Sequence, residues 1–268
     1  MKLIQVCSNY LLNPLSTKGA ISMLEMLLAS TLAGLATGIG ALPILFIKTI
    51  SHKVRDTMLG FAAGVMVAAS CFSLIAPALE IGSIWETIGG IIAGVFVLTL
   101  VDTLIPHIHP GEMHGNPEDF KVWRRALLMI IAITLHNIPE GLAVGVGYGS
   151  EEMGIGLVIA VAIAAQNAPE GLVVAAPLRE KGIKPWKVLA IATATGLVEP
   201  IGALFGFAVV NVAAGLLPFA LAFAAGAMLF VVSSELMPET HGHGYEKLAT
   251  LSFIGGFILM MMLDYLLG

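Results

Sequence analysis

The feature that most constrains this chain is a series of apolar stretches, each about 20 residues long, separated by short charged clusters. A helix of that length crosses the hydrocarbon core of a bilayer with its backbone hydrogen bonds satisfied internally. Hydrophobic residues make up 57% of the 268 residues and charged residues only 12%, against about 25% in soluble domains. A water-soluble globule is therefore excluded, and the sequence predicts an all-α polytopic membrane protein embedded in a lipid bilayer.

The lengths of the apolar stretches predict eight transmembrane helices in a single domain of residues 24–268. The expected spans are residues 24–47, 57–79, 88–106, 124–148, 154–177, 187–211, 215–237 and 248–267. Residues 1–23 are expected to form a tail or a short extra helix. Ser8, Asn9 and Pro14 interrupt this segment and make it a poor cleaved signal peptide.

Basic residues follow alternate spans, and this asymmetry sets the orientation. Apart from Lys2 and Lys18, all of the 13 basic residues lie after the first, third, fifth and seventh spans. They are Lys48, Lys53, Arg55, Lys121, Arg124, Arg125, Arg179, Lys181, Lys184, Lys187 and Lys247. These loops are expected in the cytoplasm, which places both termini outside.

Charge, cysteine content and small residues narrow the class further. A net charge of −5 without a long basic run excludes a nucleic-acid partner, and two cysteines are too few for a disulfide framework. Glycines recur four residues apart and predict close approach of helix backbones in lipid. They are Gly34 and Gly38, Gly60 and Gly64, Gly90 and Gly94, Gly141, Gly145 and Gly149, and Gly202 and Gly206.

Two predicted spans contain a repeated polar motif at mid-depth. The segment HNIPEG begins at His136 in the fourth span, and QNAPEG begins at Gln166 in the fifth. In each motif the first residue and the glutamate are four apart, so they project from one helix face. Asn137 and Asn167 lie beside that face and are also compatible with simple interhelical hydrogen bonding. Polar residues at this depth are costly and indicate a functional site.

The donors in these motifs indicate a cation site. Glu140, Glu170 and Glu199 are three carboxylates within spans that contain no Lys or Arg, so they require a positive charge. The prolines that precede two of these glutamates, together with Pro200, leave backbone carbonyls without their helical donor. Nitrogen and oxygen donors suit zinc, iron(II), manganese or cadmium better than an alkali ion. A structural role for Glu199 as partner of a backbone amide stays open.

Weaker candidates lie toward the cytoplasmic loops. The loop of about residues 107–121 contains His107, His109 and His114, a sparse metal-capturing tract. Glu235, near the end of the seventh span, and two following histidines are candidates for an exit path. Those two histidines are His241 and His243.

With these motifs in place, the chain resembles the ZIP (Zrt- and Irt-like) divalent metal transporters, in the bacterial-type branch with Gln in the fifth span. The segments FAAGVMVAASCFSLIAPALE, GLVEPIGALFG and SSELMPETHGHG extend the resemblance over the whole set of spans. It implies an inverted repeat of spans one to three and six to eight around spans four and five. It also implies an inner (plasma) membrane protein that moves zinc, cadmium, iron or manganese toward the cytoplasm without a cofactor.

The resemblance also implies a binuclear site. One ion would be held by His136, Glu140, Gln166 and Glu170, with Met66 nearby; the other would be held by Asn137, Glu140, Asn167, Glu170 and Glu199. Many family members have His where this chain has Gln166, so the donor set here is weaker for zinc.

Two other functions are alternatives to metal transport. A proton- or cation-exchanging protein would also use buried carboxylates and a histidine. An intramembrane metal hydrolase needs three protein ligands with an open water position, commonly in an HExxH motif, which this chain lacks. The sequence therefore predicts a protein that is not an enzyme, and it leaves the oligomeric state open between a monomer and a homodimer.

Overall fold

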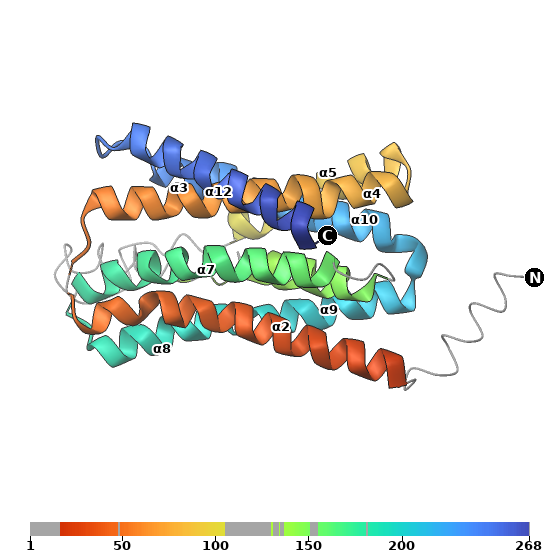
Figure 1. Ribbon diagram of the computed structural model, residues 1–268, viewed down its shortest axis with the longest axis horizontal. Helices are drawn as coiled ribbons and strands as arrows, with labels where there is room; N and C mark the ends of the chain where they lie inside the picture. Colours follow the sequence, from red (N-terminus) through yellow and green to blue (C-terminus); the bar gives the residue numbers. More distant parts are fainter. Residues whose placement is uncertain are drawn as a thin grey trace, which may run out of the picture.

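The computed structural model describes residues 17–47, 49–104, 130, 134, 137–150, 155–180 and 182–267. Across these residues the regular elements are all helical, and they form an elongated bundle (Figure 1). Within them, six helices are long and apolar enough to cross a membrane. These are Ser22–Leu45, His52–Ile81, Ile155–Ala176, Pro185–Val210, Leu217–Glu239 and Glu246–Leu266. The predicted all-α membrane class is thereby confirmed.

The elements follow one another as up-and-down helices. The first part comprises α2 (Thr17–Ala41), the 3₁₀ turn η1 (Leu42–Leu45), α3 (His52–Ala68), the π-helical η2 (Ala69–Ile75), α4 (Ala76–Ile81) and α5 (Ile84–Leu104). A helical segment at residues 137–149 and α7 (Ile155–Glu180) come next. The last part comprises α8 (Pro185–Gly196), α9 (Glu199–Val212), η4 (Ala214–Leu216), α10 (Leu217–Val231), the π-helical η5 (Val232–Leu236), α11 (Met237–Glu239) and α12 (Glu246–Leu267).

Glycines allow the helices to pack backbone against backbone. Gly60 and Gly64 of α3 lie against Ala249 and Phe253 of α12, and Gly90 and Gly94 of α5 lie against Phe219 and Phe223 of α10. Gly34 of α2 meets Gly196 of α8, while Gly202 and Gly206 of α9 meet Ile138 and Leu142. A side chain at any of these positions would overlap backbone atoms of the neighbouring helix. The close packing predicted from the four-residue glycine spacing is thus confirmed.

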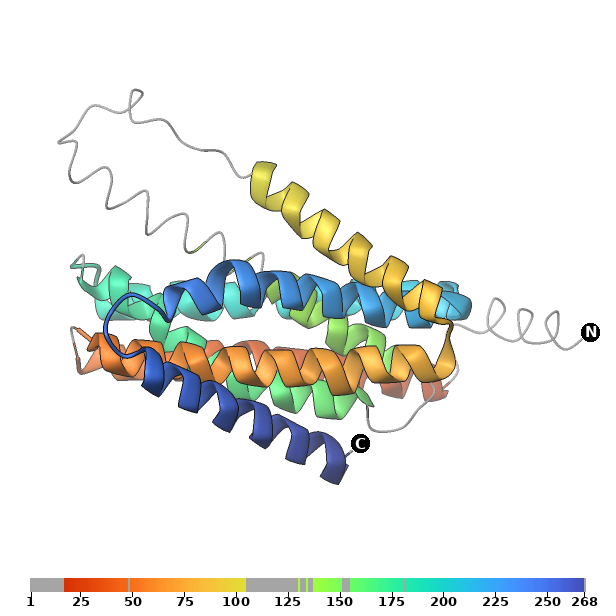
Figure 2. The same ribbon diagram turned by 90° about the horizontal axis from the view of Figure 1, so that it is seen from above.

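The outer surface is apolar and has aromatic residues near its ends. Figure 2 shows α5 and α12 along the outside of the bundle, and the span in α12 is only 17% buried. Trp85 is the second residue of α5 at one end and Trp186 the second residue of α8 at the other, with 77% and 60% of their surfaces exposed. Tryptophans at both ends of an apolar surface are typical of the two membrane–water interfaces.

The connections between helices divide by charge between the two ends of the bundle. The α2–α3, α7–α8 and α11–α12 connections lie at one end, on the left in Figure 1. This end carries Lys53, Lys184 and Lys247, whereas Glu80 and Glu86 lie at the other end. Three of the four basic loops that the sequence assigns to one side of the membrane are therefore on one side of the bundle, and the fourth, with Lys121, Arg124 and Arg125, lies outside the described residues.

Candidate metal-transport site

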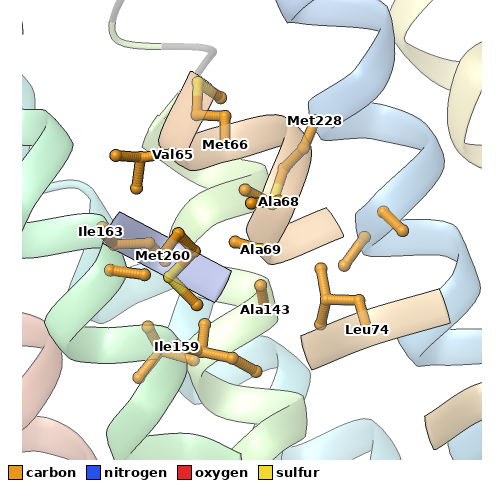
Figure 3. Close-up of a cluster of buried hydrophobic side chains, with 14 of the residues drawn as sticks. Val65, Met66, Ala68, Ala69, Leu74, Ala143, Ile159, Ile163, Met228 and Met260 are labelled. Atoms are coloured by element: carbon orange, nitrogen blue, oxygen red, sulfur yellow. The ribbon is translucent and has the colours of Figure 1, made fainter. Parts of the chain in front are cut away.

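A polar layer interrupts the apolar core at the centre of α7. Gln166, Asn167 and Glu170 lie halfway along this 26-residue helix, and their exposed fractions are 0%, 0% and 5%. Before them, residues 158–163 of α7 contribute to one apolar cluster, which Figure 3 shows together with side chains of α3, α10 and α12. After them, most of residues 172–178 contribute to a second cluster. The polar layer therefore lies between two apolar clusters along α7.

Hydrogen bonds join the two repeated motifs to each other and to α9. The Gln166 amide nitrogen donates to Oε1 of Glu140, which links α7 to the helical segment 137–149. The Asn167 amide nitrogen donates to Oε1 of Glu199 at 2.5 Å and to the backbone carbonyl of Ala33 in α2 at 2.9 Å. Two motif residues that are adjacent in sequence thus reach different carboxylates on different helices.

The break between α8 and α9 positions Glu199. Pro200 occupies the first turn of α9 and has no N–H for the carbonyl of Gly196, so the helix ends there and restarts at Glu199. The Glu199 side chain is fully buried in the first turn of α9, where the helix dipole favours a negative charge. Pro169 does not end its helix in this way, because α7 continues as one helix through it. On the other side of the break, the Asn137 amide nitrogen donates to the carbonyl of Thr195 at 2.8 Å.

Three buried amide oxygens of this layer lack a hydrogen-bond donor among the residues that the structure describes. Oδ1 of Asn137, Oε1 of Gln166 and Oδ1 of Asn167 are buried and accept no hydrogen bond within the described residues. Each amide group is anchored by its nitrogen and leaves its oxygen toward the interior. Such buried acceptors are costly unless a water or an ion satisfies them. Oxygen atoms of carboxylates and amides are suitable ligands for a cation.

The glycine that ends each motif determines how closely the surrounding helices approach the glutamates. A Cβ at Gly141 would lie 2.7 Å from Cα and C of Glu199 in α9. A Cβ at Gly171 would lie 2.7 Å from the carbonyl carbon of Thr37 in α2. The Pro-Glu-Gly repeat therefore places a carboxylate and a backbone contact next to each other on both helices.

Of the remaining predicted residues, some lie within the described part of the chain and some do not. Met66 is fully buried in the apolar cluster that also contains Ala143 and Ile163 (Figure 3). Ala143 follows Glu140 by three residues, and Ile163 precedes Gln166 by three. Glu235 lies in the π-helical η5. Four predicted residues lie outside the described residues: His136, His107, His109 and His114.

Of the two histidines after α11, His243 has a ring nitrogen within ion-pair distance of a buried acidic side chain. Nδ1 of His241 is 2.9 Å from both the Thr240 hydroxyl and the Met237 carbonyl. Nδ1 of His243 lies 3.3 Å from Oδ1 of Asp56, and the His243 ring stacks on that of His52. Sequence reasoning did not select Asp56, although His52 and Asp56 have the same four-residue spacing as His136 and Glu140.

Comparison with known proteins identifies the family. A family model described as ZIP Zinc transporter matches residues 111–264. The chain is similar to zinc transporter GufA of Myxococcus xanthus, with 42% identity over 251 residues that cover 90% of this chain and 98% of that protein. It is similar to zinc transporter ZIPB of Bordetella bronchiseptica, with 40% identity covering 87% and 78% of the two chains. Zinc transporter ZupT of Chlorobaculum parvum is 36% identical, covering 85% and 92%. This chain belongs to the ZIP zinc transporter family.

Proposed function

We propose that this protein carries zinc across the membrane toward the cytoplasm, and that cadmium, iron(II) and manganese are weaker substrates. The observation that carries the proposal is the buried layer of carboxylates and inward amide oxygens between two apolar clusters. The names of its relatives, which are zinc transporters, support the choice of metal. In this family the metal is the cargo, and the protein is a transporter rather than an enzyme.

The ligands are proposed to form a binuclear site with Glu140 and Glu170 as bridges. His136, Gln166 and Met66 complete the shell of one ion, and the other ion is held by the amide and carboxylate side chains of Asn137, Asn167 and Glu199. Glu140 and Glu199 are fully buried and Glu170 is 5% exposed, so three ionised groups at this depth would be costly without bound cations. This electrostatic demand supports bound divalent cations, and the inference of two ions rather than one comes from the number of ligands that the two motifs supply.

The proposed topology has eight spans with an inverted repeat. The segment 137–149 would be the end of the fourth span, and α5 would be the third. Corresponding spans two and seven share an unusual local structure: the π-helical segments η2 and η5 are each followed by a short helix with proline in its first turn. The grouping of basic loops at one end of the bundle supports a cytoplasmic position for that end.

Zinc flux into liposomes tests the proposed function. Purified protein is reconstituted in vesicles that contain a fluorescent zinc indicator, and zinc is added outside. The proposal expects protein-dependent zinc entry that saturates with zinc concentration. Vesicles that move protons or sodium but no zinc would instead support the exchanger, and the absence of any metal flux would contradict the proposal.

Replacing Gln166 by His is expected to lower the half-saturating zinc concentration and to reduce manganese uptake relative to zinc. An imidazole is a stronger and softer donor than an amide oxygen, so it favours zinc over manganese. The maximal rate is expected to fall, because a more tightly held ion leaves more slowly. Competition uptake with both metals measures the ranking. An unchanged ranking would show that residue 166 does not contact the ion.

Single cysteines are expected to report the orientation. After Cys7 and Cys71 are replaced by Ala, cysteines at the exposed positions Lys53 and Lys184 should react with a membrane-impermeant thiol reagent only from the cytoplasm. A cysteine at exposed Glu80, at the other end of the bundle, should react only from outside. Labelling of intact cells and of inverted vesicles makes the comparison. The opposite pattern would overturn the orientation.

A further inference from the structure

A second group of metal-ligating side chains lies at the end of the bundle that carries the basic loops. His52 and Asp56 occupy the first turns of α3, and His243 comes from the connection between α11 and α12. One ligand atom from each residue lies within 4.8 Å of the other two. The ligands of a tetrahedral zinc ion stand roughly 3.3–3.6 Å apart, as follows from bonds of about 2.0–2.2 Å. Side-chain rotations that tilt the two imidazoles out of their stacked arrangement would bring the three atoms onto one ion.

The carboxylate of this cluster is buried without a partner that neutralises it fully. Asp56 has an exposed fraction of 0%, and neither of its oxygens accepts a hydrogen bond within the described residues. The adjacent Arg55 points elsewhere and pairs with Glu239 of α11. A buried carboxylate in this state is costly, and a bound cation is one of the few ways to compensate it.

The backbone of the loop that carries His243 is held by specific contacts. Gly242 and Gly244, on either side of His243, have positive φ angles of 108° and 85°, which other residues adopt only with strain. The backbone N–H groups of both glycines donate to Oε1 of Glu246, each at 3.1 Å. The His243 and His52 rings are stacked with centroids 4.3 Å apart. The backbone of this loop is thus fixed by glycine conformation and by two hydrogen bonds, which keeps His243 next to His52 and Asp56.

We propose that His52, Asp56 and His243 form a third metal site, which binds one divalent ion of the zinc type in addition to the intramembrane pair. Two imidazoles and one carboxylate are a donor set that zinc, cobalt(II) and iron(II) accept readily. Three protein ligands leave a fourth position open for water. His52 is exposed and the His243 side chain is 27% exposed, so an ion at this site exchanges with the solution.

Along the proposed direction of transport, the third site comes after the intramembrane site. Asp56 and Met66 are ten residues apart on α3, which corresponds to about 15 Å along the axis at 1.5 Å per residue. The third site thus takes up the ion after it leaves the polar layer and releases it to the cytoplasm. This assignment rests on the proposed direction of transport, whereas the binding of the metal does not.

The test is cobalt binding to the purified full-length chain in which Glu140 and Glu170 are both replaced by Gln. Four-coordinate cobalt(II) absorbs strongly in the visible range, so its spectrum reports the site without any transport. One cobalt per chain with a four-coordinate spectrum is expected, and excess zinc should displace it. Absence of this signal would overturn the proposal and leave Asp56 and His243 as an ion pair only.

Single substitutions in that background identify the ligands. His243→Ala and Asp56→Asn are each expected to weaken cobalt binding by about 10–100-fold or more, since even outer-shell partners of metal ligands are worth that much. His241→Ala is the matched control, because His241 lies in the same loop and is engaged with Thr240 and Met237. Binding should be unchanged in the control. Equal losses in His241→Ala and His243→Ala would contradict the assignment.

This experiment separates the third site from the proposed function. Cobalt binding that depends on His243, in a protein that moves no zinc when Glu140 and Glu170 are intact, would refute transport and retain the third site. Zinc flux in the intact protein without cobalt binding in the double variant would refute the third site and retain transport.

Discussion

Replacement of Glu140 or Glu170 by Gln is expected to abolish zinc transport while the bundle stays folded. Each substitution keeps the size of the side chain and the ability to hydrogen-bond, but it removes one of the charges that would bridge the two ions. The buried position of both groups makes the loss severe, because water cannot replace the missing ligand. We expect zinc flux to fall by about 100-fold or more, since outer-shell partners of metal ligands alone are worth roughly 10–100-fold.

The matched control for these variants is Glu86→Gln. Glu86 is exposed at the start of α5, where its carboxylate accepts hydrogen bonds from the backbone N–H and the hydroxyl of Ser83 at 2.7 and 2.9 Å. Gln fills this capping role as well, so zinc flux should be unchanged. Gel filtration and circular dichroism check that all variants are folded. Near-normal flux in either Glu140→Gln or Glu170→Gln would contradict the role of these glutamates as bridging ligands.

Replacement of Gly141 by Ala is expected to impair transport without removing any ligand. The new methyl group would meet the backbone of Glu199 in α9, which cannot turn aside as a flexible side chain could. The two helices must separate, and overpacking of this kind typically costs about 1–3 kcal/mol of stability. Because the contact is at Glu199 itself, the separation also shifts that carboxylate within the proposed metal site. A displacement of about 1 Å lowers the rate by roughly 100-fold in catalytic sites. We therefore expect zinc flux in this variant to fall by more than about 10-fold.

Gly255→Ala provides the control for the effect of the methyl group. Gly255 is on the exposed face of α12, and nothing lies within 4 Å of the position that a Cβ would occupy. Its thermal unfolding temperature and zinc flux should match those of the unaltered protein. The Gly141 variant should instead show a lower unfolding temperature and weaker flux in parallel. Equal behaviour of both variants would mean that the close approach of α9 does not position the site.

The helical class and the polar layer were accessible from sequence because both depend on local spacing. Apolar length identifies a membrane helix wherever it occurs, and a four-residue interval fixes which side chains share a helix face. The four-residue spacing predicts that Gln166 and Glu170 share one helix face, and it predicts the same for each glycine pair. It does not predict which carboxylate each amide reaches.

Other features depend on contacts between distant segments or on small changes in backbone geometry. Asn137 and Asn167 occupy equivalent motif positions, yet the first donates to the carbonyl of Thr195 and the second to Glu199. The difference arises at the break between α8 and α9, which presents a backbone carbonyl to the first motif and the Glu199 carboxylate to the second. The π-helical segments depend on a shift of the hydrogen-bond register that composition does not specify. The cluster around Asp56 combines α3 with a loop near the C-terminus, and neither segment alone indicates it.

The binuclear site is tested most directly by anomalous X-ray diffraction from crystals of the full chain grown with zinc and measured at the zinc absorption edge. Two anomalous peaks are expected between α7 and the segment 137–149. They should lie about 3.5–4 Å apart, as in other two-metal sites, with carboxylate oxygens of Glu140 and Glu170 between them. A single peak at this position, or none while zinc is bound elsewhere, would contradict a binuclear site.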